Sequence, residues 1–253
     1  MVAVLIVLAG AGAWRWWYIA HANQTDIVYT TAIGQRRKLD LKDGSVVLLD
    51  TDSVVDVHYG RGARKVGLKR GRAEFTVKHN PDRPFIVHAG DGVVTDLGTT
   101  FQVSVGGNGN VNVVLIRGKV SVKAARSETV LLAGQALRFN RAGIVRAAHP
   151  ADLSFALGWT RGKLIVHNWP LPRLVAAMNR YSSLKLEIAD PALGNVRVTG
   201  TFRAGDQRTL IKVLQSGWSI HADRVSPESV RLSGERGGRS LSSKPGEGRR
   251  SRG

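Results

Sequence analysis

The sequence lacks cysteine entirely across its 253 residues. This absence excludes disulfide frameworks, thiol nucleophiles and metal sites built on thiolates. Acidic residues are scarce as well, because 19 Asp and Glu oppose 37 Lys and Arg and leave a formal charge of +18. Nevertheless, 43% hydrophobic and 22% charged residues are typical of a globular chain rather than a disordered one. The length is sufficient for one large or two ordinary domains with packed cores.

Motifs of catalysis and of metal or cofactor binding are also missing. The seven histidines are scattered along the chain, without the close pairing of a helical zinc motif. Asp50-Thr51-Asp52 lies between two strand-like runs, so a turn held by Asx hydrogen bonds is favoured over an acid/base pair. The glycine-rich residues 106–110 join two strands and predict a hairpin loop rather than a phosphate site. We therefore expect no enzyme activity, no catalytic residues, no cofactor and no metal.

Six basic residues fall within one stretch of twelve. They are Arg61, Arg64, Lys65, Lys69, Arg70 and Arg72. No aromatic side chains lie among them to stack on bases, so we expect no nucleic-acid partner. The pattern favours the solvated face of a strand over a specific anion site. If this face binds anything, anionic lipid head groups or an acidic protein surface are the reasonable partners.

Residues 1–20 form an apolar segment. Residues 2–13 are uncharged but cover about 18 Å as a helix, so the segment must continue to residue 20 to approach the roughly 30 Å of a bilayer core. Its Trp and Tyr residues suit the membrane interface, where the side chain of Arg15 can extend to water. A transmembrane anchor is favoured, and a signal peptide cleaved near Ala20-His21-Ala22 is the alternative. An anchor places the rest of the chain on the far side of a membrane.

Residues 26–150 follow the period of β-strands. Residues 73–77, 100–105 and 119–123 alternate apolar with polar side chains, as half-buried strands do. Turn signals with Gly, Asn, Asp and Pro separate these runs at short intervals. We therefore expect an all-β domain of sandwich, barrel or solenoid type. Its core should contain the apolar members of the alternating runs, namely Val55, Val57, Phe75, Val77, Phe101, Val103, Val120 and Val122.

Residues 159–232 predict a small α+β domain with the order β-α-β-β-α-β-β. Its first helix carries a buried stripe of Leu171, Leu174, Val175 and Met178 at helical spacing. Its second helix begins after Asp206 and is expected to stop at Gly217, with a strand following at residues 218–222. Residues 233–253 are rich in Gly, Ser, Arg and Lys and predict a disordered basic tail.

Short motifs in this order make the sequence similar to the FecR family. They are YTTAIGQRR at 29–37, LKDGSVVLL at 41–49, DLGTTFQV at 96–103, LAGQ at 132–135, WTRGKL at 159–164 and NRY at 179–181. The resemblance covers residues 26 to 232. FecR proteins are inner-membrane regulators that control an extracytoplasmic-function (ECF) sigma factor. The resemblance therefore implies a mainly β fold, with a solenoid- or sandwich-like sensor followed by an α+β domain similar to the secretin/TonB short N-terminal domain.

The same resemblance implies the location and the partners. The chain is expected to be a single-pass inner-membrane protein, an anti-sigma factor or regulator with its main body in the periplasm. Its partner there would be the signalling domain of a TonB-dependent outer-membrane transporter, in signal transduction that regulates iron uptake. Family members usually have a cytosolic segment that contacts the ECF sigma factor, and nothing before Met1 corresponds to it. We therefore expect a sigma-factor partner only if such a segment is restored.

The partner surface is expected on the small domain. The strand around residues 196–202 turns Arg197, Thr199 and Thr201 to one face, and it is a candidate edge strand to which a partner could add a strand. The helix face around Arg173 and Arg180 is the next candidate. The alternative function is an exported carbohydrate- or cell-wall-binding module, which would use the tryptophans outside the anchor as stacking platforms. These are Trp159, Trp169 and Trp218.

Overall fold

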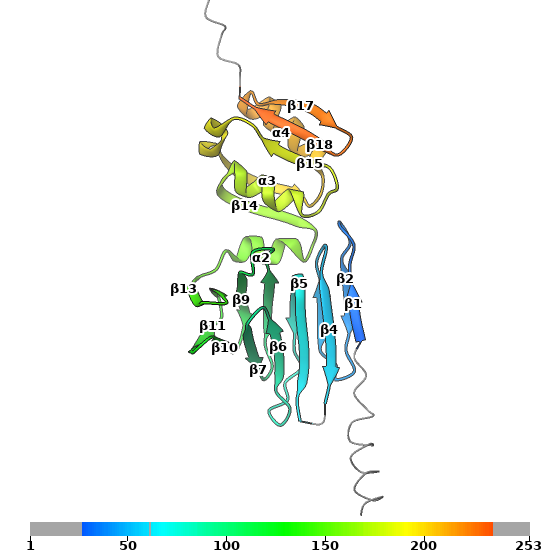
Figure 1. Ribbon diagram of the computed structural model, residues 1–253, viewed down its shortest axis with the longest axis vertical. Coiled ribbons are helices and arrows are strands. Elements are labelled where there is room, and N and C mark those ends of the chain that lie inside the picture. Colours follow the sequence, from blue (N-terminus) through cyan, green and yellow to red (C-terminus); the bar gives the residue numbers. More distant parts are fainter. Residues whose placement is uncertain (1–26, 61, 235–253) are drawn as a thin grey trace, which may run out of the picture.

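The computed structural model describes residues 27–60 and 62–234 (Figure 1). The expected anchor at residues 1–20 lies outside the described residues, as does all of the expected tail after Gly234. Within the described ranges, no helix has the length and apolar character needed to cross a membrane. The described chain forms two bodies stacked end to end, a β domain and a smaller α+β domain, with α2 at their boundary.

The β domain is built on one sheet of thirteen strands. Its strands are β1 Ile27–Thr30, β2 Arg37–Asp40, β3 Val46–Leu49, β4 Val54–Tyr59, β5 Arg64–Thr76, β6 Phe85–Ala89, β7 Gly92–Asp96, β8 Thr100–Val105, β9 Val111–Arg117, β10 Lys119–Ala124, β11 Ser127–Leu132, β12 Gln135–Asn140 and β13 Gly143–Pro150. All neighbours pair antiparallel except β5 and β6, which pair in parallel. The glycine-rich residues 106–110 form the β8–β9 hairpin loop, as predicted.

Strand β5 belongs to two layers at once. Its first half pairs with β4 and β6, and its second half pairs with β3 and β8. One layer has the order β1-β4-β5-β6-β7-β10-β11, and the other has the order β2-β3-β5-β8-β9-β12-β13. Side chains from both layers meet between them, since Phe75 on the second half of β5 contacts Phe85 on β6 at 5.9 Å between ring centroids. The fold is a sandwich with one shared strand, which confirms the mainly β prediction.

The core follows the predicted alternation. All eight side chains expected in it are buried. Phe75 also stacks on Phe101 with ring centroids 5.1 Å apart, so the aromatic side chains of β5, β6 and β8 lie at its centre. Such packing of alternating apolar residues provides the hydrophobic free energy that holds the two layers together.

Gly71 allows β5 to pass from one layer to the other. Its φ of +88° is one that side-chain-bearing residues rarely adopt. A Cβ at this position would lie 2.2 Å from Ser53 Oγ and 2.6 Å from the carbonyl oxygen of Asp52. The Ser53 hydroxyl in turn donates to the Arg72 carbonyl oxygen at 3.1 Å and accepts from the Arg72 N–H at 3.0 Å. The bend at Gly71 therefore fixes where Arg72 emerges from the strand.

The α+β domain has its own hydrophobic core, formed by residues between Trp159 and Leu232. Its elements, with α2 before them, are α2 Leu153–Trp159, β14 Lys163–Pro170, α3 Leu171–Asn179, β15 Lys185–Ile188, the 3-10 helix η1 Pro191–Asn195, β16 Arg197–Arg203, α4 Gln207–Trp218, β17 His221–Ser226 and β18 Ser229–Ser233. From β14 to β18 the predicted order β-α-β-β-α-β-β is confirmed, with η1 inserted before β16. The strands form two small sheets, β14-β16 and β15-β18-β17.

Two local predictions in this domain differ from the structure, and one helix before it was not predicted. Helix α4 continues past Gly217 to Trp218, and the left-handed residue that ends it is Ser219, with φ 50°. The following strand consequently begins at His221 rather than at residue 218. Helix α2 was not expected at all, although the side chain of Asp152 caps it by accepting the N–H of Phe155 at 3.1 Å.

Candidate functional site at the domain junction

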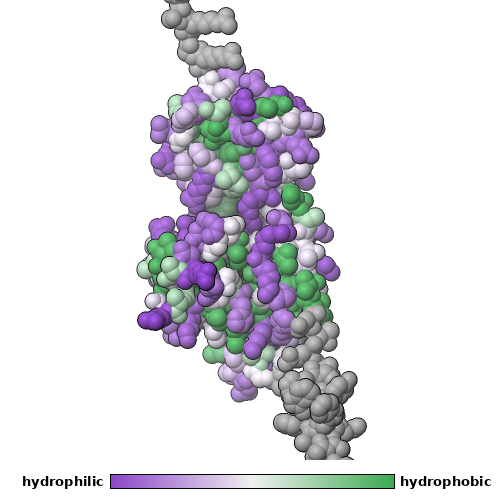
Figure 2. Space-filling model, in the orientation of Figure 1, coloured by the Kyte–Doolittle hydropathy of each residue, from purple (hydrophilic) through white to green (hydrophobic). Residues whose placement is uncertain are grey.

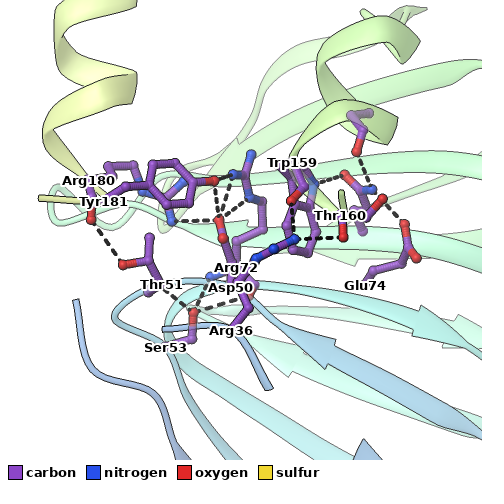
Figure 3. Close-up of polar contacts among 12 residues, drawn as sticks. Arg36, Asp50, Thr51, Ser53, Arg72, Glu74, Trp159, Thr160, Arg180 and Tyr181 are labelled. Atoms are coloured by element: carbon purple, nitrogen blue, oxygen red, sulfur yellow. Dashed lines mark hydrogen bonds and ion pairs between the residues drawn. The ribbon is translucent and has the colours of Figure 1, made fainter. Parts of the chain in front are cut away.

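A buried carboxylate lies where the two domains meet. Asp50 follows β3, and its side chain is fully buried beside Arg72 on β5. Arg72 donates to a single oxygen of this carboxylate, Asp50 Oδ2, from Nη2 at 2.6 Å and from Nε at 2.8 Å (Figure 3). The short distances are those of a charge-assisted pair. Both residues belong to the β domain, so this ion pair does not require the second domain.

The second domain completes the cluster from the end of α3. The Tyr181 hydroxyl donates to Asp50 Oδ2 at 2.9 Å and accepts from Arg72 Nη2 at 2.5 Å. The Arg180 guanidinium lies 3.6 Å from the same oxygen. Asp50 Oδ1, in contrast, is buried with no hydrogen-bond partner among the described residues. One oxygen thus receives every contact while the other receives none, an arrangement that leaves part of the desolvation cost of Asp50 uncompensated.

The electrostatics of this cluster follow from burial and from its two guanidinium groups. Burial raises the pKa of Tyr181 to about 12 and outweighs the opposing effect of Arg72, so the hydroxyl remains a donor to Asp50 at neutral pH. Burial, followed by the nearby Arg72 charge, lowers the pKa of Arg180, against which Asp50 acts in the opposite direction. Two cations share one anion here. The negative charge of Asp50 therefore offsets the repulsion between the two arginines.

Aromatic side chains cover the other face of Arg72. Its guanidinium lies 4.5 Å from the ring centroid of Trp159 and 5.2 Å from that of Phe155, both on α2. The Trp159 indole N–H donates to Gln102 Oε1 at 2.9 Å, and Gln102 Nε2 donates to the Ala156 carbonyl oxygen at 2.8 Å. Cation–π contacts of this kind are stronger when water is excluded. Helix α2 is thereby attached to both β5 and β8.

Two further side chains connect the domains by hydrogen bonds to backbone. Arg36, just before β2, donates to the carbonyl oxygens of Trp159 at 3.1 Å and Thr160 at 2.8 Å, at the end of α2. The Thr51 hydroxyl donates to the Arg180 carbonyl oxygen at 3.1 Å and accepts the Gly34 N–H at 2.7 Å. Figure 2 shows that the surface around this junction is largely hydrophilic. These polar contacts connect the residues that follow α3 to the β3–β4 turn and to β5.

The structure corrects how two sequence features were interpreted. Arg64 and Arg72 were expected on a solvated strand face, but both are buried and paired with Asp43 and Asp50, respectively. Lys65, Lys69 and Arg70 are exposed as expected, and Arg61 lies outside the described residues. The Asp50-Thr51-Asp52 segment does contain a turn, yet the Asp50 carboxylate binds Arg72 and Tyr181 instead of local backbone.

The residues proposed for partner binding fall into two places. Arg197, Thr199 and Thr201 are exposed on β16, while Val198 and Phe202 on the opposite face are buried. Arg180 belongs to the junction cluster, and the guanidinium of Arg173 lies 3.5 Å from the ring centroid of Trp169. The structure does not bring Arg173 and Arg180 together with β16. Instead, both arginines line a cleft between the domains.

The tryptophans considered for sugar stacking are placed differently from what that function needs. Trp159 is fully buried, and Trp169 is 3% exposed. Of the three, Trp218 alone has a substantial exposed fraction, 38%. A carbohydrate platform needs aromatic faces open to solvent, whereas Trp159 and Trp169 are core residues. Trp159 and Trp169 therefore give no support to the carbohydrate-binding alternative.

Comparison with known proteins finds a family match within the first domain. A family model described as FecR protein matches residues 27–121, which confirms the FecR resemblance over these residues. Two crystal structures of a candidate anti-sigma factor from Parabacteroides distasonis, at 1.65 and 2.50 Å resolution, share the fold with TM-scores of 0.70. Each has 20% sequence identity, and the matches cover 83% of this chain and 99% or 100% of the other. No curated protein matches the chain.

Proposed function

We propose that this chain is the periplasmic sensor part of a transmembrane sigma-factor regulator. The FecR match over residues 27–121 and the fold shared with a candidate anti-sigma factor support this role. Sigma-factor control would require the cytosolic segment that FecR proteins place before their membrane anchor. The role needs partner binding and relay rather than catalysis, and the junction cluster offers contacts suited to relay.

We further propose that the α+β domain receives its signal from the periplasmic signalling domain of a TonB-dependent outer-membrane transporter. The observation that carries this proposal is the open edge of β16. Within the described residues, β16 pairs with β14 and with no other strand. An unpaired strand edge is a ready template for a strand from another protein.

The backbone direction along β16 identifies the groups available for such pairing. The Ala204 N–H donates to the Gly162 carbonyl oxygen at 2.9 Å, and the Leu171 N–H donates to the Val196 carbonyl oxygen at 2.9 Å. Because successive residues of a strand direct their backbone groups to opposite edges, even-numbered residues face β14. The N–H groups of Thr199 and Thr201 therefore face the open edge. A bulge on β14 leaves this alternation on β16 unbroken.

Positive charge next to this edge indicates an acidic partner. Thr201 and Arg203 border a cavity that also contains Arg36, Arg161 and Lys163, and no carboxylate lines it. The cavity has a volume of about 500 Å³. Like-signed groups at the rim of an interface select a partner of opposite charge and accelerate association. The strand that adds to β16 should thus carry Asp or Glu near its end.

Signal relay from β16 has a direct structural route. β16 pairs with β14, β14 continues into α3, and α3 ends at Asn179, directly before Arg180 and Tyr181, which contact Asp50. Pairing at the edge would tighten β16 against its neighbours and shift the end of α3. Asp50 and Arg72 would then report that shift to the β domain.

Replacing Thr201 tests this proposal. Thr201→Pro removes an N–H that faces the open edge and should weaken binding to a purified transporter signalling domain at least about tenfold, while an edge strand tolerates proline. Thr201→Val keeps the N–H and is the matched control, expected to bind as wild type. Thr199 is less suitable, because its hydroxyl accepts the Asn168 N–H at 2.9 Å. Equal affinity of folded Thr201→Pro and wild type by calorimetry would exclude β16 as the docking edge.

A further inference from the structure

The cleft that holds Arg173 and Arg180 is unusually rich in arginine. It has a volume of about 430 Å³ and lies between the β domain, α2 and α3. Five arginines line it, whereas Asp152 is the one carboxylate among its lining residues. The five are Arg72, Arg138, Arg146, Arg173 and Arg180. The volume is within the range of about 300–1,000 Å³ that is usual for small-molecule sites.

Three of these arginines form no ion pair within the described part of the chain. Asp50 already neutralises Arg72 and contacts Arg180. Arg138, Arg146 and Arg173, by contrast, form no ion pair with any described residue. The lone carboxylate, Asp152, accepts the Phe155 N–H at 3.1 Å and the Trp169 indole N–H at 3.2 Å. It carries one negative charge, which is too little to neutralise three arginines.

The free arginines are placed where their charges repel. Arg138 on β12 and Arg146 on β13 are direct cross-strand partners, a position where like charges destabilise a sheet. Arg173 comes from the second domain, and its pKa is lowered, first by burial and also by the charge of Arg138, against the opposing effect of Asp152. Uncompensated repulsion across a domain boundary would be relieved by a negatively charged ligand.

Polar groups on the same walls can complete the recognition of such a ligand. Asn112 on β9 pairs across the strands with Arg138 and lines the cleft, as do Ser104 and His149. Guanidinium groups bind carboxylates and phosphates through parallel hydrogen bonds, and nearby amides and hydroxyls add direction. Both domains contribute donors, so a bound anion would connect β12 and β13 to α3.

We propose that this cleft binds a small molecule carrying two or more anionic oxygen groups, phosphates or carboxylates, and that binding fixes the α+β domain against the β domain. The ligand neutralises Arg138, Arg146 and Arg173 together. This inference is independent of transporter docking, because the cleft and the open edge of β16 are separate places on the molecule.

Calorimetric titration of the purified full chain tests the proposal. Pyrophosphate represents the phosphate class and succinate the dicarboxylate class. Binding at one site per chain is expected for at least one of them, and the response to each assigns the class. An absence of saturable binding for both anions up to about 1 mM would overturn the proposal.

Charge-matched variants separate a built site from general attraction to a basic protein. Arg138→Gln/Arg146→Gln should weaken binding at least about tenfold, because two charged hydrogen-bond donors are lost. Arg126→Gln/Arg141→Gln removes the same charge from exposed positions outside the cleft and should bind as wild type. Equal loss in both double variants would show attraction by net charge and overturn the site.

The melting temperature of the ligand-free protein provides an independent readout. Removing two facing like charges should leave the melting temperature of Arg138→Gln/Arg146→Gln unchanged or raise it. Pyrophosphate or succinate, whichever binds, should raise the melting temperature of the wild type and leave that of this variant unchanged. A ligand-free double variant that melts below the wild type would contradict the repulsion on which the proposal rests.

Discussion

Two buried arginines on β5, Arg64 and Arg72, form ion pairs of different construction. Arg64 pairs with Asp43 at 2.8 Å, and both oxygens of Asp43 are satisfied, one by the Ser45 N–H and Tyr59 hydroxyl, the other by Arg64 and the Ser45 hydroxyl. All of these groups belong to the β domain. Asp50, the partner of Arg72, uses one oxygen, and its additional donors come from the second domain.

This difference separates the stability of the β domain from the coupling between the two domains. A carboxylate satisfied within one domain stabilises that domain whatever its neighbours do. A carboxylate satisfied partly by a second domain, with one oxygen unpartnered, stabilises only one relative position of the two. The pair at Arg64 therefore serves the fold, and the pair at Arg72 makes the fold sensitive to where α3 lies.

Breaking the pair within the β domain should have the largest effect. Arg64→Met leaves the partly buried Asp43 carboxylate without its cation and should lower the free energy of unfolding by about 3 kcal/mol. Urea unfolding monitored by tryptophan fluorescence measures this loss. A decrease below about 1 kcal/mol would show that Ser45 and Tyr59 satisfy Asp43 without the arginine.

Acid should reveal the same pair without any mutation. Burial alone would raise the pKa of Asp43, but hydrogen bonds from Ser45, Tyr59 and Arg64 outweigh it and lower the pKa to about 2. The folded-state pKa is below the unfolded value, so the stabilisation of about 2 kcal/mol is present at neutral pH and is lost as the pH falls from about 4 to 2. Asp43→Asn should lose this part of the acid dependence, which unfolding curves measured at successive pH values would detect.

The junction pair should respond to a smaller change. Tyr181→Phe removes one hydroxyl that bridges Arg72 and Asp50, and we expect a loss of about 1.5 kcal/mol. A double-mutant cycle with Thr51→Val, which removes a second contact between the domains, should show coupling, whereas a cycle with Tyr59→Phe should be additive within about 0.5 kcal/mol. Equal coupling energies in both cycles would contradict the view that the Arg64 pair stabilises the β domain while the Arg72 pair couples the two domains.

Alkaline pH provides a second test of Tyr181. Its pKa is raised to about 12, so the folded state retains the proton longer than the unfolded state. The stabilisation is complete below about pH 10 and is lost as the pH rises to about 12. The stability difference between wild type and Tyr181→Phe should shrink over this window. A difference that stays constant would place the importance of Tyr181 in its ring rather than its hydroxyl.

The smallest effect is expected at a third arginine of β5. Arg70 pairs with Asp52 at 2.8 Å, but the side chains are 62% and 48% exposed. Exposed pairs contribute little, so Arg70→Gln should change the free energy of unfolding by less than about 0.5 kcal/mol. The same unfolding assay makes it the internal reference for the two buried pairs. A loss comparable to that of Arg64→Met would show that burial does not distinguish these arginines.

The sequence predicted the strands and cores better than the junction, for a physical reason. Alternation and helical spacing report which face of an element is apolar, and Phe101 and Leu174 were placed correctly on that basis. An arginine in such a pattern is predicted to be exposed to solvent. Burial of Arg72 depends on Asp50, 22 residues away, and on Tyr181, 109 residues away. No local period encodes contacts at those separations.

A few signals for the missed features were nevertheless present. Asp152 is a suitable helix cap before Leu153, and it would have predicted α2 if a helix of seven residues had been considered. Tyr181 lies in the NRY motif of the family resemblance, and Asp50 lies in the Asp50-Thr51-Asp52 segment, whose two carboxylates stand out in the sequence. Their meeting required the two domains to be placed together.

The continuity of β5 has a mechanical consequence. Its first half is hydrogen-bonded to β4 and β6, and its second half to β3 and β8. The strand bends at Gly71, next to Arg72, which contacts Tyr181 of the second domain. A force that pulls on the second domain therefore acts on β5 near its middle, and β5 distributes that force to both layers at once. Neither layer can slide past the other without breaking the hydrogen bonds of β5. Under tension the β domain should yield as a single unit, in one step.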